Sequence, residues 1–130
     1  MKLEHVALNV ADPIAMAKWY VEHLGMKVVH STDPPISAHF LADSSGTVMI
    51  EIYHNPPDAV PDYAGTDPLV LHLAFVSPDP GTDRDRLLGA GATFHKEEAL
   101  ADGGVVIMLR DPWGVPVQLC RRGKPLLRQV

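Results

Sequence analysis

The chain has 130 residues, of which 46% are apolar and 21% charged, and it carries a net charge of −5. This composition is typical of a globular protein, at a length that fits one compact domain or two small modules. The acidic balance, together with the absence of a Lys/Arg block, argues against a nucleic-acid partner.

The single cysteine, Cys120, rules out an intrachain disulfide and fits a reducing compartment. The first ten residues have a strand pattern and lack the apolar core and cleavage site of a secretory signal. No apolar run approaches the roughly 18 residues that a membrane-spanning helix needs. We therefore expect a cytoplasmic protein with no membrane partner.

The first half of the chain, residues 1–55, predicts a strand, a helix and three further strands. Alternating apolar residues predict a strand over 3–10, and Asp12-Pro13 is a typical start for a helix that Gly25 ends. Further strands are predicted over 26–30, 36–41 and 47–53, the last two of them joined by a turn at 44–46.

Residues 56–68 are dense in Pro, Gly and Asp and predict a connection. The order of elements then repeats over residues 69–122, ahead of a C-terminal tail at 123–130. Strands are predicted over 69–76, 92–96, 105–110 and 115–120, with a short, polar helix over 82–88. The repeat predicts an α+β fold of two βαβββ modules, with the helices on the outer faces of the sheets.

Four polar residues interrupt apolar strands at matched positions. His5 and Glu51 are 46 residues apart, as are His72 and Gln118, and the two pairs are offset by 67 residues. The same offset matches Leu41 with Met108. Because residues two apart share a face of a strand, each candidate should point away from the aliphatic face that packs against a helix.

Two imidazoles, one carboxylate and one amide oxygen suit one divalent ion of Zn, Ni, Co, Mn or Fe. Taken alone, a strand histidine is more often a hydrogen-bonded core residue, and a mid-strand glutamate usually faces solvent. The joint placement of His5, Glu51, His72 and Gln118 on equivalent strands favours the metal site. A carboxylate at the position of Glu51 also needs a cation partner or water.

The duplicated βαβββ order, together with the segments IEIYHN, LHLAF and RDPWGVPVQL, resembles the vicinal oxygen chelate superfamily. That superfamily includes glyoxalase I, methylmalonyl-CoA epimerase, extradiol dioxygenases, and the fosfomycin and bleomycin resistance proteins. The resemblance implies curled mixed sheets that form a cleft. It also implies metal ligands on the first and last strands of each module, which correspond to His5, Glu51, His72 and Gln118. Members of this length are commonly homodimers.

The resemblance further implies a divalent-metal enzyme of the glyoxalase-like branch. Such an enzyme performs lyase or isomerase chemistry, through an enolate or enediolate, on a small substrate that chelates by vicinal oxygens. Gln118 departs from the pattern, because a glutamate is usual there and an amide cannot act as a base. The catalytic proton transfer would therefore fall to Glu51 or to a hydroxide on the metal.

Two alternatives stay open from the sequence. An extradiol-type Fe(II) or Mn(II) dioxygenase would use His5, His72 and Glu51 as its two histidines and one carboxylate. A metal-free protein of the same fold would bind and sequester a drug or metabolite, and the matched spacing would then be a relic of an ancestral metal site.

Overall fold

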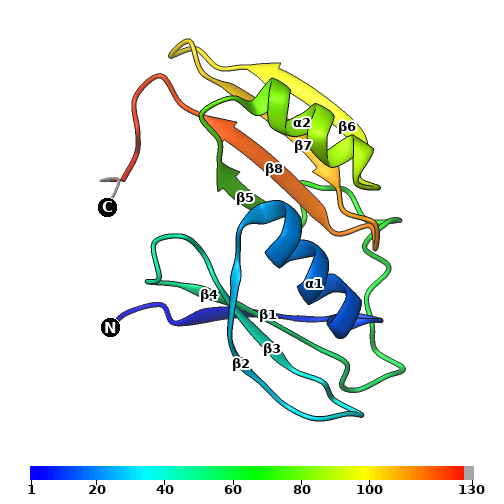
Figure 1. The fold of residues 1–130 in the computed structure, drawn as a ribbon. Helices are drawn as coiled ribbons and strands as arrows, with labels where there is room; N and C mark the ends of the chain where they lie inside the picture. The colour runs from blue at the N-terminus through cyan, green and yellow to red at the C-terminus, as the bar shows by residue number, and fades with distance from the viewer. Residues whose placement is uncertain (128–130) are drawn as a thin grey trace. The chain divides into compact units, whose positions relative to one another are not determined.

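A computed structural model of the protein describes residues 1–127, in which two helices and eight strands occur. The chain divides between Pro61 and Asp62 into two compact units, which we call module 1 and module 2. Each module contains one helix and one open, four-stranded mixed sheet (Figure 1). The predicted α+β fold of two βαβββ modules is therefore confirmed.

Module 1 contains β1 (His5–Asn9), α1 (Pro13–Leu24), β2 (Lys27–Ser31), β3 (His39–Ala42) and β4 (Met49–Tyr53). Its strands lie in the order β1-β4-β3-β2, and β1 runs parallel to β4 while the other pairs are antiparallel. The first and last strands of the module are therefore hydrogen-bonded neighbours.

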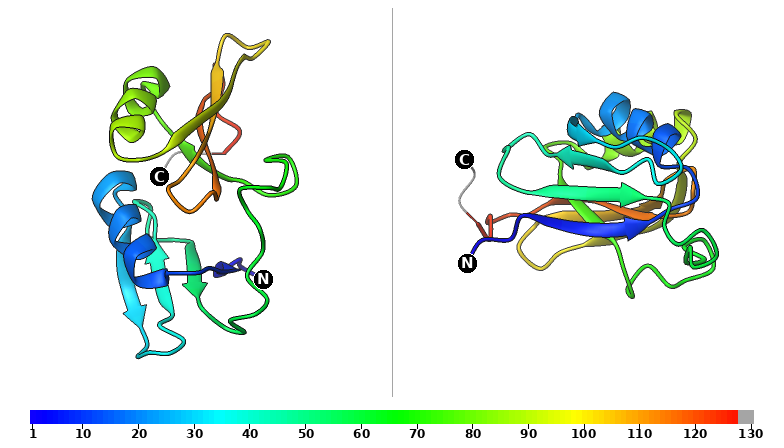
Figure 2. Two further views of the ribbon diagram at one scale, coloured as in Figure 1. Left: turned by 90° about the vertical axis from the view of Figure 1, so that its right-hand side faces the viewer. Right: turned by 90° about the horizontal axis from the view of Figure 1, so that it is seen from below.

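Module 2 repeats this topology with β5 (Leu73–Val76), α2 (Pro80–Gly89), β6 (Thr93–Ala99), β7 (Val105–Arg110) and β8 (Pro116–Arg121). Its strand order is β5-β8-β7-β6, and β5 runs parallel to β8. In each module the helix lies along one face of its own sheet, as the two views of Figure 2 show.

The core of each module lies between its helix and the aliphatic face of its sheet. In module 1 the fully buried Tyr20 of α1 packs in the same core as Leu41 and Ile52. In module 2 the buried Leu87 of α2 plays the same part, with Leu109 and Val117 beneath it. Full burial of side chains of this size contributes roughly 1.5–3 kcal/mol each, so these faces fix which way each strand turns.

The second helix is longer than the sequence predicts, because its first turn is built by a cap. Asp79 is its N-cap, and one oxygen of its carboxylate accepts a hydrogen bond from the Thr82 N–H at 3.1 Å. Asp12 caps α1 in the same way, and the two caps share a φ of −139° and a ψ of 81°. The dipeptides Asp12-Pro13 and Asp79-Pro80 are 67 residues apart, so the repeat already contained this signal.

The first strand of module 2 is shorter than predicted and begins at Leu73 rather than at residue 69. Asp67 explains the difference, since its side chain accepts from the Leu69 N–H at 2.9 Å and its carbonyl accepts from the Val70 N–H at 2.9 Å. These bonds form a turn that leaves Leu69 and Val70 81% and 74% exposed. The apolar letters before His72 therefore belong to a turn.

One match that the offset predicts is wrong by a single residue. Leu41 faces Ile50 across β3 and β4, and the equivalent partner of Val117 is Leu109 rather than Met108. The third strands of the modules are therefore offset by 68 residues, while the first and last strands keep 67. One residue inserted between the second and third strands of module 2 accounts for this shift.

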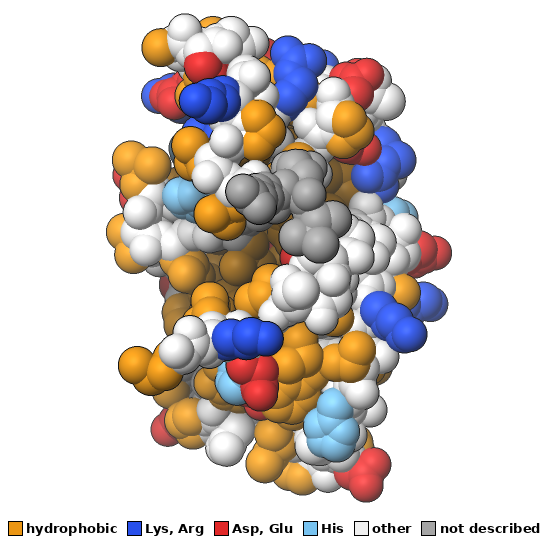
Figure 3. Space-filling model, turned by 90° about the vertical axis from the view of Figure 1, so that its left-hand side faces the viewer, with side chains coloured by type: hydrophobic (Ala, Val, Ile, Leu, Met, Phe, Trp, Pro, Cys, Tyr) orange, Lys and Arg blue, Asp and Glu red, His pale blue; other side chains and the backbone are white. Residues whose placement is uncertain are grey.

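Charged and apolar side chains alternate over the surface that Figure 3 shows. No helix within residues 1–127 is long and apolar enough to cross a membrane. The predicted tail over 123–130 is described only as far as Leu127.

We expect Asp79→Ala to lower the free energy of unfolding by about 1 kcal/mol at pH 7, because the first turn of α2 loses its acceptor. The hydrogen bonds from Thr82 hold the pKa of the Asp79 carboxyl below its usual value. The stabilisation is therefore complete above the unfolded pKa, about 3.9, and is lost as the pH falls through the lower pKa of the folded state.

Urea unfolding of the wild type and Asp79→Ala at several pH values measures this difference. Asp58→Ala, which removes an exposed carboxyl outside any helix, is the control. An equal loss of stability in both variants would show that Asp79 contributes no more than an ordinary surface charge.

Candidate metal-binding site

In module 1 the structure brings His5 and Glu51 together. His5 begins β1 and Glu51 is the middle residue of β4. The parallel register pairs His5 with Met49 and Ala7 with Glu51, so both candidates lie on the sheet face turned away from the helix. His5 Nε2 lies 3.4 Å from Glu51 Oε2, with the two side chains 34% and 19% exposed.

The other edge of the His5 ring is also held. Its Nδ1 lies 2.9 Å from Oε1 of Glu4. The ring of Phe40, which faces Glu51 from β3, meets the imidazole edge to face at a centroid distance of 5.6 Å. The imidazole is thus fixed by one carboxylate on each nitrogen and by an aromatic ring.

The spacing of His5 Nε2 and Glu51 Oε2 fits two ligands of one ion. Donors about 2.1 Å from a divalent metal are roughly 3.0 Å apart at an octahedral angle and roughly 3.4 Å apart at a tetrahedral one. The same 3.4 Å also fits an ion pair when His5 is protonated. The pair provides the cation partner that the sequence requires for Glu51.

In module 2, His72 and Gln118 occupy the equivalent positions. Gln118 of β8 pairs with Ala74 of β5, as Glu51 pairs with Ala7 in module 1. His72 precedes Ala74 by two residues, as His5 precedes Ala7, although β5 begins one residue after His72. Gln118 stays partly exposed between the buried Val117 and Leu119.

The ring of His72 is held by the backbone. Its Nδ1 lies 2.8 Å from the carbonyl oxygen of Pro68, within the turn that Asp67 forms. Both candidate histidines therefore have an oxygen at Nδ1. The nitrogen left for a ligand is Nε2 in each case.

Each module by itself carries two of the four predicted donors. Within residues 1–127 no group of three or more His, Cys, Asp or Glu side chains lies close enough together to hold a metal ion. The geometry of the pair in module 1 fits a metal, and the backbone of module 2 presents its two donors at matching places.

Arg110 ties the segment that precedes His72 to the turn that precedes Gln118. Its Nη1 donates to the carbonyl oxygens of Tyr63 at 2.7 Å and Gly114 at 3.1 Å, and its Nη2 donates to that of Thr66 at 2.7 Å. Gly114 has a φ of +87°, and a Cβ there would lie 2.7 Å from the side chain of Ala64. The sequence analysis missed this anchor, because Arg110 matches no charged residue in module 1.

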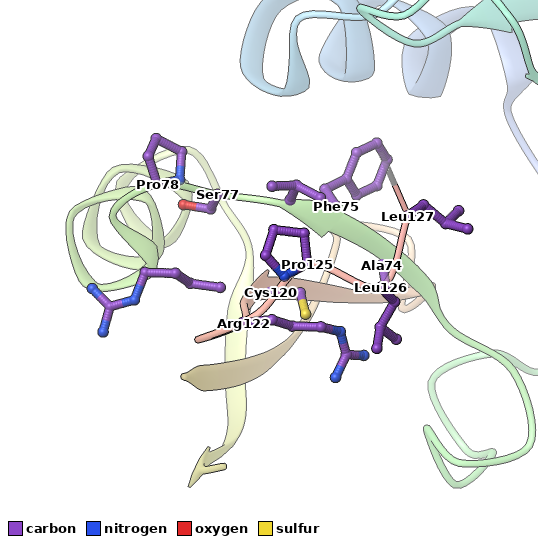
Figure 4. A pocket seen from close by; sticks show the side chains of 11 residues that line it. Ala74, Phe75, Ser77, Pro78, Cys120, Arg122, Pro125, Leu126 and Leu127 are labelled. Carbon is purple, nitrogen blue, oxygen red and sulfur yellow. The ribbon is translucent and has the colours of Figure 1, made fainter. Parts of the chain in front are cut away.

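Module 2 also contains a cavity of about 630 Å³ that opens near the end of β8. Cys120, two residues after Gln118, is a buried free thiol on its wall. Figure 4 shows Cys120 between Ser77 at one end and Leu126 of the tail at the other. Most of the wall is apolar, and the lining residues are Ala74, Phe75, Val76, Ser77, Pro78, Cys120, Arg121, Arg122, Pro125, Leu126 and Leu127.

The model of the glyoxalase/bleomycin resistance protein/dioxygenase superfamily matches residues 2–119 of the chain. A solved glyoxalase family protein from Enterococcus faecalis is 25% identical, with a TM-score of 0.71 over 92% of this chain and 97% of that one. No curated protein sequence matches.

Two further solved structures show the same fold at 18% identity. An antibiotic-binding protein from Streptomyces sp. CB03234 has a TM-score of 0.72, covering 94% of this chain and 96% of its own. A lactoylglutathione lyase from Agrobacterium tumefaciens has a TM-score of 0.66, covering 91% of each chain. At this level of identity the likeness concerns the fold alone.

We expect Arg110→Lys to lower the free energy of unfolding by about 1–3 kcal/mol, because an ammonium cannot reproduce the planar fork that reaches three carbonyls. The control is Arg86→Lys, since Arg86 meets Asp83 at the surface and such pairs contribute about 0–1 kcal/mol. Urea unfolding measures both. Equal stability of the two variants would contradict the anchoring role of Arg110.

Proposed function

The chain belongs to the glyoxalase/bleomycin resistance protein/dioxygenase superfamily, and from this membership we propose that it is a divalent-metal enzyme of the glyoxalase-like branch. The proposed reaction is a lyase or isomerase step on a small molecule that binds through two vicinal oxygens. The observation that carries the proposal is the pairing of His5 Nε2 with Glu51 Oε2 at 3.4 Å, on a scaffold that module 2 repeats.

We propose His5, Glu51, His72 and Gln118 as the ligands of one divalent ion of Zn, Ni, Co, Mn or Fe. Support comes from the matched registers, in which Glu51 and Gln118 each pair with the alanine two residues after a histidine. All four side chains are partly exposed among buried neighbours, so they are accessible to an ion without being free of the fold. Nitrogen and oxygen donors in this mixture suit these metals.

When bound, the metal would polarise a substrate carbonyl and stabilise the negative charge of an enolate or enediolate. Glu51 is the only carboxylate of the set, so it is the residue that would accept a proton from the carbon beside that carbonyl. Gln118 cannot take this part. Because Gln118 is neutral, the donor set brings one negative charge and leaves the site net positive, which favours an anionic substrate group.

We further propose a cytoplasmic homodimer. The reason for the location is the single, buried and free Cys120. The reason for the dimer is the family resemblance of a chain of this length.

Elemental analysis of protein purified without chelator tests the proposed metal. We expect about one metal ion per wild-type chain and a large loss in Glu51→Ala, since the site loses its only charged donor. Glu98→Ala, at an exposed glutamate on β6, should keep the metal. The metal found then decides the assay, because iron or manganese would call for measuring oxygen consumption as an extradiol-type dioxygenase, and other metals for isomerase or lyase assays.

Metal absent from the wild type, and not taken up on titration, would rule out the metal enzyme. The function then favoured is metal-free binding of a small molecule. Two observations support that second candidate: the apolar cavity beside Cys120 and the structural likeness to an antibiotic-binding protein.

Gln118→Glu should lower the dissociation constant for zinc by roughly tenfold, because metal affinity rises with the number of charged ligands. Gln118→Leu should raise the dissociation constant, since it removes the amide oxygen and keeps a similar volume. Isothermal titration calorimetry of the metal-free proteins measures both. Unchanged affinity in the two variants would show that Gln118 is not a ligand.

A further inference from the structure

The two candidate histidines are oriented by different means. The oxygen at Nδ1 of His72 belongs to the backbone of Pro68, whereas the oxygen at Nδ1 of His5 belongs to the side chain of Glu4. Glu4 lies just before β1, and its own carbonyl accepts from the Met49 N–H at 2.9 Å. A side chain can be changed without altering the backbone, so the role of Glu4 can be isolated by mutation.

A neutral imidazole carries one N–H and one lone pair, and only the lone pair can bind a cation. Two carboxylates compete for the N–H of His5, with Glu4 Oε1 at 2.9 Å from Nδ1 and Glu51 Oε2 at 3.4 Å from Nε2. The closer contact is that of Glu4. It favours the tautomer with the proton on Nδ1 and the lone pair of Nε2 facing Glu51.

We propose that Glu4 is a positioning residue, which holds His5 as the Nδ1–H tautomer so that Nε2 and Glu51 together can accept a metal ion. The metal part of this inference rests on the proposed function. Without Glu4, the acceptor that remains beside the ring is Glu51, and the proton should move to Nε2. The lone pair would then point away from Glu51, and metal binding would have to reverse the tautomer first.

A contribution of Glu4 to stability is a poor readout, because its side chain is 72% exposed and pairs of this kind contribute about 0–1 kcal/mol. The tautomer is a direct one. The chain offers a matched control in Glu22, which also precedes a histidine, is 62% exposed and lies 3.8 Å from His23 Nε2 on α1. His72 is an internal control, since its Nδ1 partner is a carbonyl.

The experiment is long-range ¹H–¹⁵N correlation of ¹⁵N-histidine-labelled, metal-free protein at a pH of about 9, well above the ordinary imidazole pKa of about 6.5. The His5 signals are assigned with a His5→Asn variant. In the wild type and in Glu4→Gln, whose amide oxygen still accepts, we expect the Nδ1–H pattern at His5. In Glu4→Leu we expect the Nε2–H pattern at His5 alone, and no change in Glu22→Leu.

Zinc titration by calorimetry gives the second readout. Loss of the partner that orients a metal-binding histidine typically weakens binding by 10–100-fold, so Glu4→Leu should raise the dissociation constant by at least roughly tenfold. Glu4→Gln should recover most of the affinity, and Glu22→Leu should match the wild type.

An unchanged tautomer in Glu4→Leu would overturn the inference, as would a changed tautomer accompanied by unchanged zinc affinity. If the wild type binds no metal, the proposed function fails separately. The spectra then still decide the role of Glu4, because a shift of the proton confined to His5 supports its control of the ring and the absence of a shift refutes it.

Discussion

The parallel pairing of the first and last strand within each module is the constraint on which the rest of the structure depends. Residues 46 apart in sequence become neighbours only because β1 lies beside β4 and β5 beside β8. The burial of Tyr20, Ile52 and their neighbours beneath the helix fixes which face of each strand is aliphatic. A slip of one residue in either pairing would turn Glu51 or Gln118 into the core, where an unpaired carboxylate or amide is costly.

Strand faces, element order and the capped first helix could be predicted from sequence because each follows from short-range patterns. Alternation placed Glu51 opposite Ile52, and Asp12 with Pro13 marked the start of α1. The prediction failed where a local hydrogen bond overrode composition. Asp67 turned two apolar residues into a turn, and Asp79 gave a polar segment enough of a start to form a ten-residue helix on one buried leucine, Leu87.

Contacts that depend on where long side chains point lay beyond the sequence. Glu4 and His5 are adjacent, and alternation would put them on opposite faces of a continuous strand. Their contact exists because β1 begins at His5, so that Glu4 is free of the pleat. Arg110 reaches carbonyls 44 and 47 residues away in sequence, and no periodicity encodes such a partner. The spacing of the four candidates, by contrast, predicted their positions on the strands.

The two modules share a backbone plan but differ in charge where it matters for chemistry. Module 1 surrounds its histidine with two carboxylates, those of Glu4 and Glu51. Module 2 surrounds its histidine with a carbonyl and presents the neutral Gln118. A proton can be taken up by a carboxylate but not by an amide near neutral pH. Duplication thus supplied two equivalent positions, and their divergence assigns proton transfer to module 1 and leaves module 2 to coordination alone.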